Sequence, residues 1–270
     1  IRDQPRSRGL GDVYKRQALY SLIGQAAAAM LTLTSRVPPE VEFTPVESVG
    51  LSAAYTLAVF LITTLILYLL RRRLHRILMA MFLSSIALST AAALLLVADQ
   101  HNVNPALAVA SSIILTALIA WENPATPLSQ SIVAGIISYV IVQLSGTIFP
   151  TTMVLALSLY DIYTVYRGPL HKIIVESGRA GAPIESTMNP IVVKTGRITV
   201  GMGDILAYTL AAAISYQKYP PPQATLTLTA LYVGIAITVA LVKRKGYVPG
   251  LPAPIWLWLA AHLALTMLQG

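Results

Sequence analysis

The chain has 270 residues, of which 56% are hydrophobic and only 11% are charged. An average soluble domain carries about a quarter charged residues, so this chain has too little polar surface for a water-soluble globule. It contains no cysteine, which excludes disulfides, thiol nucleophiles, iron–sulfur clusters and thiolate zinc sites. Its formal net charge of +8 is informative mainly through its distribution along the chain.

Apolar segments long enough to cross a membrane follow one another along most of the chain. A bilayer core needs about 20 apolar residues per helix, and prolines and glycines mark the joins between segments. The predicted spans are residues 18–35, 49–70, 77–98, 105–121, 128–145, 148–166, 198–217, 224–242 and 253–269. The sequence therefore predicts an all-α membrane protein with nine transmembrane helices, forming a single domain over residues 18–270.

The first seventeen residues differ from the rest of the chain because they are highly charged and begin with Ile1. We expect residues 1–17 to be a non-native or disordered leader outside the fold.

Basic residues are distributed unequally between the two sides of the predicted bundle. If nine spans alternate in direction, 17 of the 19 lysines and arginines fall on the side of the N-terminus, and only Arg36 and Lys218 fall on the other. Such an excess marks the cytoplasmic side. We therefore expect a multi-pass protein of the cell (plasma) membrane, with a cytoplasmic N-terminus and a cytoplasmic loop over residues 167–197. The basic groups then serve topology and lipid contact, and no nucleic acid partner is expected.

Two carboxylates lie where charge is costly. Of the 11 acidic residues, only Asp161 and Asp204 fall inside predicted spans, where a charge costs about 2.5–3.5 kcal/mol even on a lenient scale. No lysine or arginine lies inside a span to neutralise them. Measured from Arg167 and Arg197, both carboxylates lie roughly 9–10 Å below the cytoplasmic boundary, at about 1.5 Å per residue. If the sixth and seventh helices are neighbours, the two side chains face each other at one depth.

Paired carboxyls in a low-dielectric site have a recognisable chemistry. They cannot both ionise, so they share one proton and titrate as a pair. The ionised member can take a proton from a bound water while the protonated member donates to a carbonyl oxygen. The pattern favours hydrolysis of an amide by activated water, with no cofactor and no metal.

Three local motifs accompany these acids. They are Tyr160-Asp161 in the sixth span, Gly201-Met202-Gly203-Asp204 in the seventh, and Pro249-Gly250-Leu251-Pro252 before the ninth. In this order and at this depth they resemble the presenilin and signal peptide peptidase family, the Gly-x-Gly-Asp intramembrane aspartyl proteases, in particular its compact archaeal members. The resemblance extends over essentially the whole chain after residue 17.

This resemblance implies a presenilin-like bundle that cleaves transmembrane segments of other proteins, with Asp161 and Asp204 as the catalytic pair. The residues implied to bind substrate or shape the site are Tyr160, Gly201, Met202, Gly203, Pro249, Gly250, Leu251 and Pro252. Glycines before Asp204 permit close approach of another backbone, from a helix or a substrate. Tyr160 has two open interpretations, an aromatic packing residue or a hydrogen-bond partner of the carboxylates. Gly250 departs from the family, which usually has alanine there.

Two alternative functions remain open at this stage. A prepilin-type leader peptidase also uses membrane aspartates and a similar glycine motif, and a proton- or cation-coupled transporter could use the two acids as an ion site. Within the protease interpretation, the β-branched residues 191–193 predict a strand to which an extended substrate could add. The sequence leaves homo-oligomerisation open.

Overall fold

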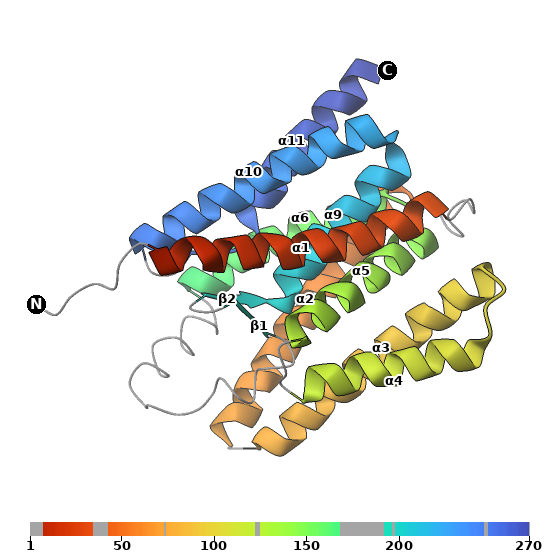
Figure 1. The fold of residues 1–270 in the computed structure, drawn as a ribbon. Coiled ribbons are helices and arrows are strands. Elements are labelled where there is room, and N and C mark those ends of the chain that lie inside the picture. Colours follow the sequence, from red (N-terminus) through yellow and green to blue (C-terminus); the bar gives the residue numbers. More distant parts are fainter. Residues whose placement is uncertain are drawn as a thin grey trace, which may run out of the picture.

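The computed structural model describes residues 8–34, 43–72, 74–121, 125–167, 192–195, 198–245 and 248–269. These residues form nine helices and one two-stranded sheet (Figure 1). The helices are α1 (Arg8–Thr34), α2 (Pro45–Arg71), α3 (His75–Gln100), α4 (Pro105–Ala120), α5 (Thr126–Ser145), α6 (Ile148–Tyr166), α9 (Met202–Lys218), α10 (Pro221–Lys245) and α11 (Pro252–Gln269). Each predicted span corresponds to one helix, so the prediction of an all-α membrane protein is confirmed, with nine helices among the described residues.

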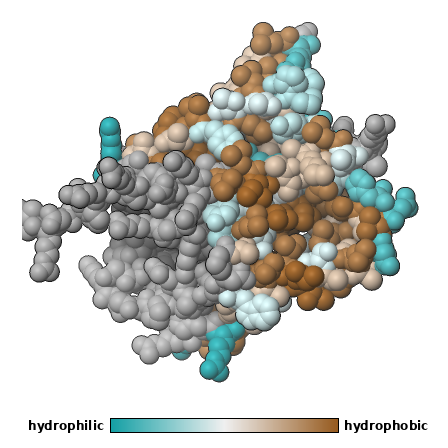
Figure 2. Space-filling view, viewed as in Figure 1, coloured by the Kyte–Doolittle hydropathy of each residue, from teal (hydrophilic) through white to brown (hydrophobic). Residues whose placement is uncertain are grey.

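Five helices are by themselves long and apolar enough to cross a membrane. The qualifying stretches lie in α2, α3, α5, α6 and α10, and the apolar parts of α1 and α4 are shorter. Large apolar side chains are exposed along α2 and α4, among them Leu57, Leu61, Ile113 and Ile114. Figure 2 shows a broad apolar area on one face, with the strongly hydrophilic residues at its margins. This surface suits contact with lipid chains rather than with water.

The helices α5 and α9 form the interior of the bundle. Helix α9 contacts α1, α5, α6, α10 and α11, and α5 contacts α1, α3, α4, α6 and α9. Nearly all of α9 from Ile205 to Ser215 is buried, including the run of alanines at 211–213. Small side chains allow this close packing, which drives association of helices in a membrane. The interior helix is thus also the one that carries Asp204.

The first helix begins earlier than the predicted span. Helix α1 starts at Arg8 and so continues into residues 8–17, which we set apart above as a leader. Residues 1–7 lie outside the described residues.

The seventh helix begins later than its predicted span. Residues 198–201 form strand β2 (Ile198–Gly201), which pairs antiparallel with β1 (Val192–Thr195), and α9 starts only at Met202. The β-branched residues Ile198, Thr199 and Val200 favour a strand, and glycines at 201 and 203 weaken a helix. The predicted strand over residues 191–193 is confirmed for Val192 and Val193, whereas Ile191 lies outside the described residues. The rest of the predicted cytoplasmic loop, residues 168–190, lies there too.

Candidate functional site

The two intramembrane aspartates are brought together by three helices that contact one another, α6, α9 and α11. Asp161 lies near the C-terminal end of α6, and Asp204 is the third residue of α9. Both side chains are partly buried, and they interact electrostatically with each other. The expected adjacency of the sixth and seventh helices is therefore present, with Asp204 in the first helical turn rather than well inside a helix.

The turn that precedes α11 contacts both carboxyl groups. The backbone N–H of Leu251 donates to Oδ2 of Asp161 at 3.0 Å, and the backbone of Gly250 interacts with the same carboxyl. On its other side, Gly250 lies against Asp204, because a Cβ added at Gly250 would be 2.6 Å from Oδ2 and 3.1 Å from Oδ1 of that residue. One two-residue turn thus links the two acids.

Prolines hold this turn in place at both ends. Pro249 is buried, and Pro252 is the first residue of α11. Proline suits the first helical position, where a backbone N–H has no helical partner in any case. The two prolines also leave Gly250 and Leu251 as the only residues of this tetrapeptide that have N–H groups. The expected irregular backbone before the ninth helix is present, and its amides point to a carboxyl group.

Of the two expectations for the glycines before Asp204, close approach of a neighbouring helix is not seen among the described residues, and close approach of a substrate stays a prediction. Gly201 is the N-cap residue of α9, and its backbone interacts with the Asp204 carboxyl, as in a capping box, where the side chain at N3 reaches back to the N-cap amide. A Cβ at Gly203 would meet no atom of the described residues within 4 Å, and a Cβ at Gly201 would make only ordinary contacts. No neighbouring helix therefore requires these glycines. As far as the described residues extend, the space at Gly203, next to Asp204 in the chain, is open.

Tyr160 and Met202 each contact residues of another helix. The Tyr160 hydroxyl is buried and has no hydrogen-bond partner among the described residues, while its ring packs edge-on against Phe60 of α2 at 6.4 Å. The described contacts of Tyr160 are those of a packing residue, and its implied part in substrate binding stays a prediction. Met202 packs toward a cluster of buried residues that includes Val133 of α5.

Sequence reasoning missed Tyr208, which lies one helical turn after Asp204. Its side chain is only 3% exposed, and its hydroxyl donates to the carbonyl oxygen of Gly250 at 3.0 Å. It also interacts electrostatically with both Asp161 and Asp204. The signal was available, because residues i and i+4 share one face of a helix.

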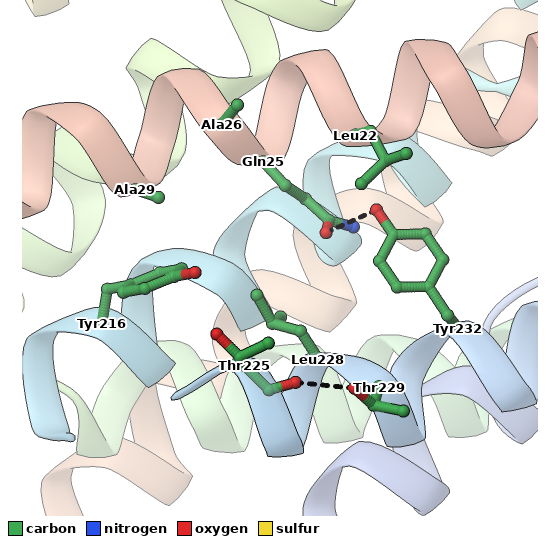
Figure 3. A pocket seen from close by; sticks show the side chains of 9 residues that line it. All are labelled: Leu22, Gln25, Ala26, Ala29, Tyr216, Thr225, Leu228, Thr229 and Tyr232. Carbon is green, nitrogen blue, oxygen red and sulfur yellow. Dashed lines mark hydrogen bonds between the residues drawn. The ribbon is translucent and has the colours of Figure 1, made fainter. Parts of the chain in front are cut away.

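A separate cavity lies between α1, α9 and α10 (Figure 3). Its volume is about 230 Å³. Figure 3 shows the hydrogen bond from the hydroxyl of Tyr232 to Oε1 of Gln25, 2.8 Å long, in this region. Neither Asp161 nor Asp204 lines this cavity, so it is distinct from the paired carboxyls. Its lining residues are Leu22, Gln25, Ala26, Ala29, Tyr216, Thr225, Leu228, Thr229 and Tyr232.

The arrangement around the aspartates provides the groups for acid–base chemistry. Two neighbouring carboxyls can share a proton, backbone N–H groups orient one of them, and open space adjoins the other. Within the part of the chain that the structure describes, no three His, Cys, Asp or Glu residues are grouped so that they could hold a metal ion.

Comparison with known proteins shows a similarity of fold but no match at the level of sequence. The sequence matches no protein-family model and no curated protein. The fold matches the structure of a presenilin family intramembrane aspartate protease with a TM-score of 0.63, over 93% of this chain and 97% of that chain, at 16% sequence identity. At this identity the likeness concerns the fold. It confirms the predicted presenilin-like bundle of this membrane protein.

Proposed function

We propose that this chain is an intramembrane aspartyl endopeptidase that hydrolyses peptide bonds within transmembrane segments. The observation that carries the proposal is the meeting of Asp161 and Asp204 on the Gly250–Leu251 turn. Two acids held beside each other inside a membrane protein are costly unless they have a function. The solved structure with the same fold is described as an intramembrane aspartate protease, which supports the same class of reaction here.

In the proposed mechanism, water is the nucleophile and no cofactor takes part. One carboxylate accepts a proton from a water bound between the two acids, and the other, protonated, donates to the oxygen of the scissile carbonyl. The product of this attack is a gem-diol. It collapses when the acid that took the proton of water gives it to the amide nitrogen, the other acid takes the proton of one diol hydroxyl, the C–N bond breaks and the amine leaves. The N–H groups of the turn hold Asp161 in place, and the open space at Gly203 gives the substrate access to Asp204.

The substrate would be a transmembrane helix of another protein that becomes extended near the site. The hairpin of β1 and β2 supports this idea, because β2 ends at Gly201, three residues before Asp204. An extended peptide added to the hairpin would expose its carbonyls, which a helix hides. Replacing Val192 with proline removes a backbone donor from β1, so we expect cleavage to fall. Unchanged cleavage would exclude strand addition at this hairpin.

The proposed setting is the cell membrane, with the N-terminus and the loop between α6 and α9 in the cytoplasm. The distribution of basic residues supports this orientation, as it places the aspartates nearer the cytoplasmic face. A cysteine introduced at the exposed Arg244, at the end of α10, should react with a membrane-impermeant thiol reagent only in opened cells. The chain has no native cysteine to interfere.

The decisive test replaces each acid separately, as Asp161→Asn and Asp204→Asn, in detergent with a purified transmembrane substrate. We expect each variant to lose cleavage by at least about a thousandfold, because neither acid alone can supply both the base and the acid. The matched control is Asp99→Asn, which changes an exposed carboxylate at the end of α3 and should cleave normally. Full activity in either variant would refute the paired mechanism.

The same assay separates the proposal from its alternatives. A transporter needs an ion gradient, so peptide release in detergent, where no gradient exists, would exclude transport as the origin of the signal. A prepilin-type leader peptidase would cut a short basic leader at the membrane surface. Mass spectrometry of the products should instead place the cut within the apolar segment of the substrate.

A further inference from the structure

We propose that Tyr208 is a positioning residue that orients Asp161 through the peptide group joining Gly250 and Leu251. The inference rests on the proposed function for its catalytic consequence, although its structural part can be tested without any activity. Tyr208 does not belong to the three motifs that revealed the site, and it acts on an acid that is carried by a different helix.

The geometry consists of two hydrogen bonds on opposite sides of one planar group. The Tyr208 hydroxyl donates to the carbonyl oxygen of Gly250 at 3.0 Å. The N–H of the same peptide group, which belongs to Leu251, donates to Oδ2 of Asp161 at 3.0 Å. Because a peptide group is rigid and planar, fixing its carbonyl also fixes the direction of its N–H. Tyr208 therefore determines where the N–H that holds Asp161 points.

The residue at position 250 explains why such a restraint is needed. A Cβ at this position would lie 2.6 Å from Oδ2 of Asp204, closer than real Cβ contacts, so glycine lets the turn approach the Asp204 carboxyl without displacing it. Glycine, however, leaves the backbone free to adopt many conformations. Without a restraint, the peptide plane after Gly250 could rotate and direct its N–H away from Asp161. The hydrogen bond from the Tyr208 hydroxyl to the carbonyl oxygen of Gly250 prevents this rotation of the Gly250–Leu251 peptide plane.

The position of Tyr208 also connects the two acids mechanically. Asp204 and Tyr208 are four residues apart on α9 and so lie on one face of it, and the surrounding part of α9 is packed on all sides. Helix α9 thus contains Asp204, and through Tyr208 and the Gly250–Leu251 turn it also helps to position Asp161, which belongs to α6. Their relative position then depends on α9 rather than on the contact between α6 and α9 alone.

The test is Tyr208→Phe, which removes one oxygen atom and keeps the ring. The matched control is Tyr219→Phe at the C-cap of the same helix, because Tyr219 is also 3% exposed and also donates to a backbone carbonyl, that of His262. We expect Tyr208→Phe to lower kcat about tenfold with little change in KM, the size of effect that one such hydrogen bond can have on a transition state. Tyr219→Phe should leave both constants unchanged.

Hydrogen exchange provides a readout that is independent of cleavage. Within residues 249–252 only Gly250 and Leu251 have amide hydrogens, since the other two are prolines. We expect the Leu251 amide to be protected in the wild-type protein and to exchange at least about tenfold faster in Tyr208→Phe, with α9 itself unchanged. A Leu251 amide that exchanges at the rate of an unstructured peptide in the wild-type protein would overturn the proposal, even if the variant failed to fold.

The two measurements also separate this proposal from the proposed function. If the wild-type protein cleaves no substrate, the proposed function fails, and the exchange of Leu251 still tests the role of Tyr208. If Tyr208→Phe cleaves with wild-type kcat, or if KM alone changes, Tyr208 does not position Asp161. If Leu251 exchange and kcat change equally in Tyr219→Phe, the effect belongs to packing of α9, and the proposal is again wrong.

Discussion

At each end of the contact between α9 and the segment 248–269, a tyrosine hydroxyl donates a hydrogen bond to a backbone carbonyl. We call these two hydrogen bonds the tethers, and they differ in what they hold in place. At one end Tyr208 donates to the carbonyl of Gly250, and at the other Tyr219 donates to the carbonyl of His262 at 2.8 Å. Both tyrosines are equally buried. The difference lies in the backbone to which each accepting carbonyl belongs. His262 is within helix α11, where the helix orients the peptide, whereas Gly250 is in an irregular turn whose next N–H holds Asp161.

The surroundings of the two tethers differ in the same way. Near Tyr219 the described residues form a network of hydroxyl, indole and amine groups in which Trp258 donates to Ser215 at 3.0 Å and Lys218 donates to Thr266 at 3.1 Å. Near Tyr208 the partners include both carboxyl groups. We propose that the Tyr219 end serves stability and that the Tyr208 end serves the proposed active site, and the variants below test this division.

Among the variants that test this division, the largest effect is expected at the Tyr208 end, from Gly250→Ala. The added Cβ would press on the Asp204 carboxyl, which has to move, and a displacement of about 1 Å in a catalytic group can cost about a hundredfold in rate. We expect cleavage to fall between tenfold and a hundredfold, measured as kcat/KM, although alanine is the usual residue of the resembling family.

The control for this change is Gly50→Ala in α2, where a Cβ would meet no atom within 4 Å. This variant should retain activity and gain a little stability, because alanine favours a helix more than glycine does. If Gly250→Ala cleaved at the wild-type rate, the turn would have to move aside at little cost, and the positions of the two aspartates would not depend on it.

The next effect is expected from Gly234→Ala, which lies between the two ends, where α10 meets the start of α11. A Cβ at Gly234 would lie 2.6 Å from the backbone nitrogen of Pro254 and 2.7 Å from the carbonyl oxygen of Ala253. Backbone atoms cannot rotate away, so α10 and α11 must separate. We expect a loss of about 1–3 kcal/mol in the free energy of unfolding, measured by thermal unfolding in detergent, and a smaller loss of cleavage than Gly250→Ala causes.

Much of this architecture could be predicted from the sequence because the bilayer requires it. Each helix had to be a long apolar run, and the cost of a buried charge singled out Asp161 and Asp204 from the other acids. Hydropathy does not register the start of α9, because Ile198, Thr199 and Val200 are as apolar in a strand as in a helix. Only their β-branched side chains and the glycines that follow indicated the hairpin.

The parts of the site that were not predicted depend on tertiary contacts. Tyr160 is adjacent to Asp161 in sequence but faces Phe60 of α2, whereas Tyr208 is four residues from Asp204 and reaches Gly250, 42 residues away in the chain. Proximity in the sequence drew attention to Tyr160 and not to Tyr208. The helical period would have selected Tyr208 as a neighbour of Asp204, but its partner could be known only from the position of the turn before α11.

A moderate effect on stability alone is expected from Ser215→Ala at the Tyr219 end. Ser215 is fully buried and accepts hydrogen bonds from the indole N–H of Trp258 and from the hydroxyl of Thr227. Without this acceptor the buried indole N–H has no partner, which costs about 1–3 kcal/mol. The melting temperature in detergent should fall, while kcat per folded molecule should not change. A selective loss of kcat would show that the two ends are coupled through α9.

The smallest effect is expected from Tyr219→Phe, and it decides whether the division between the two ends is real. Its hydroxyl donates to His262 and contacts Thr266 at 2.8 Å, but the helical hydrogen bonds of α11 keep the His262 peptide in place without it. We expect a loss of about 1 kcal/mol or less in the free energy of unfolding and an unchanged kcat. Tyr208→Phe should give the reverse, a modest change in stability with a clear loss of kcat. The two variants remove the same atom from equally buried side chains, one within α9 and one at its C-cap, so a loss of kcat in Tyr208→Phe alone would support a role of the peptide beyond its hydroxyl.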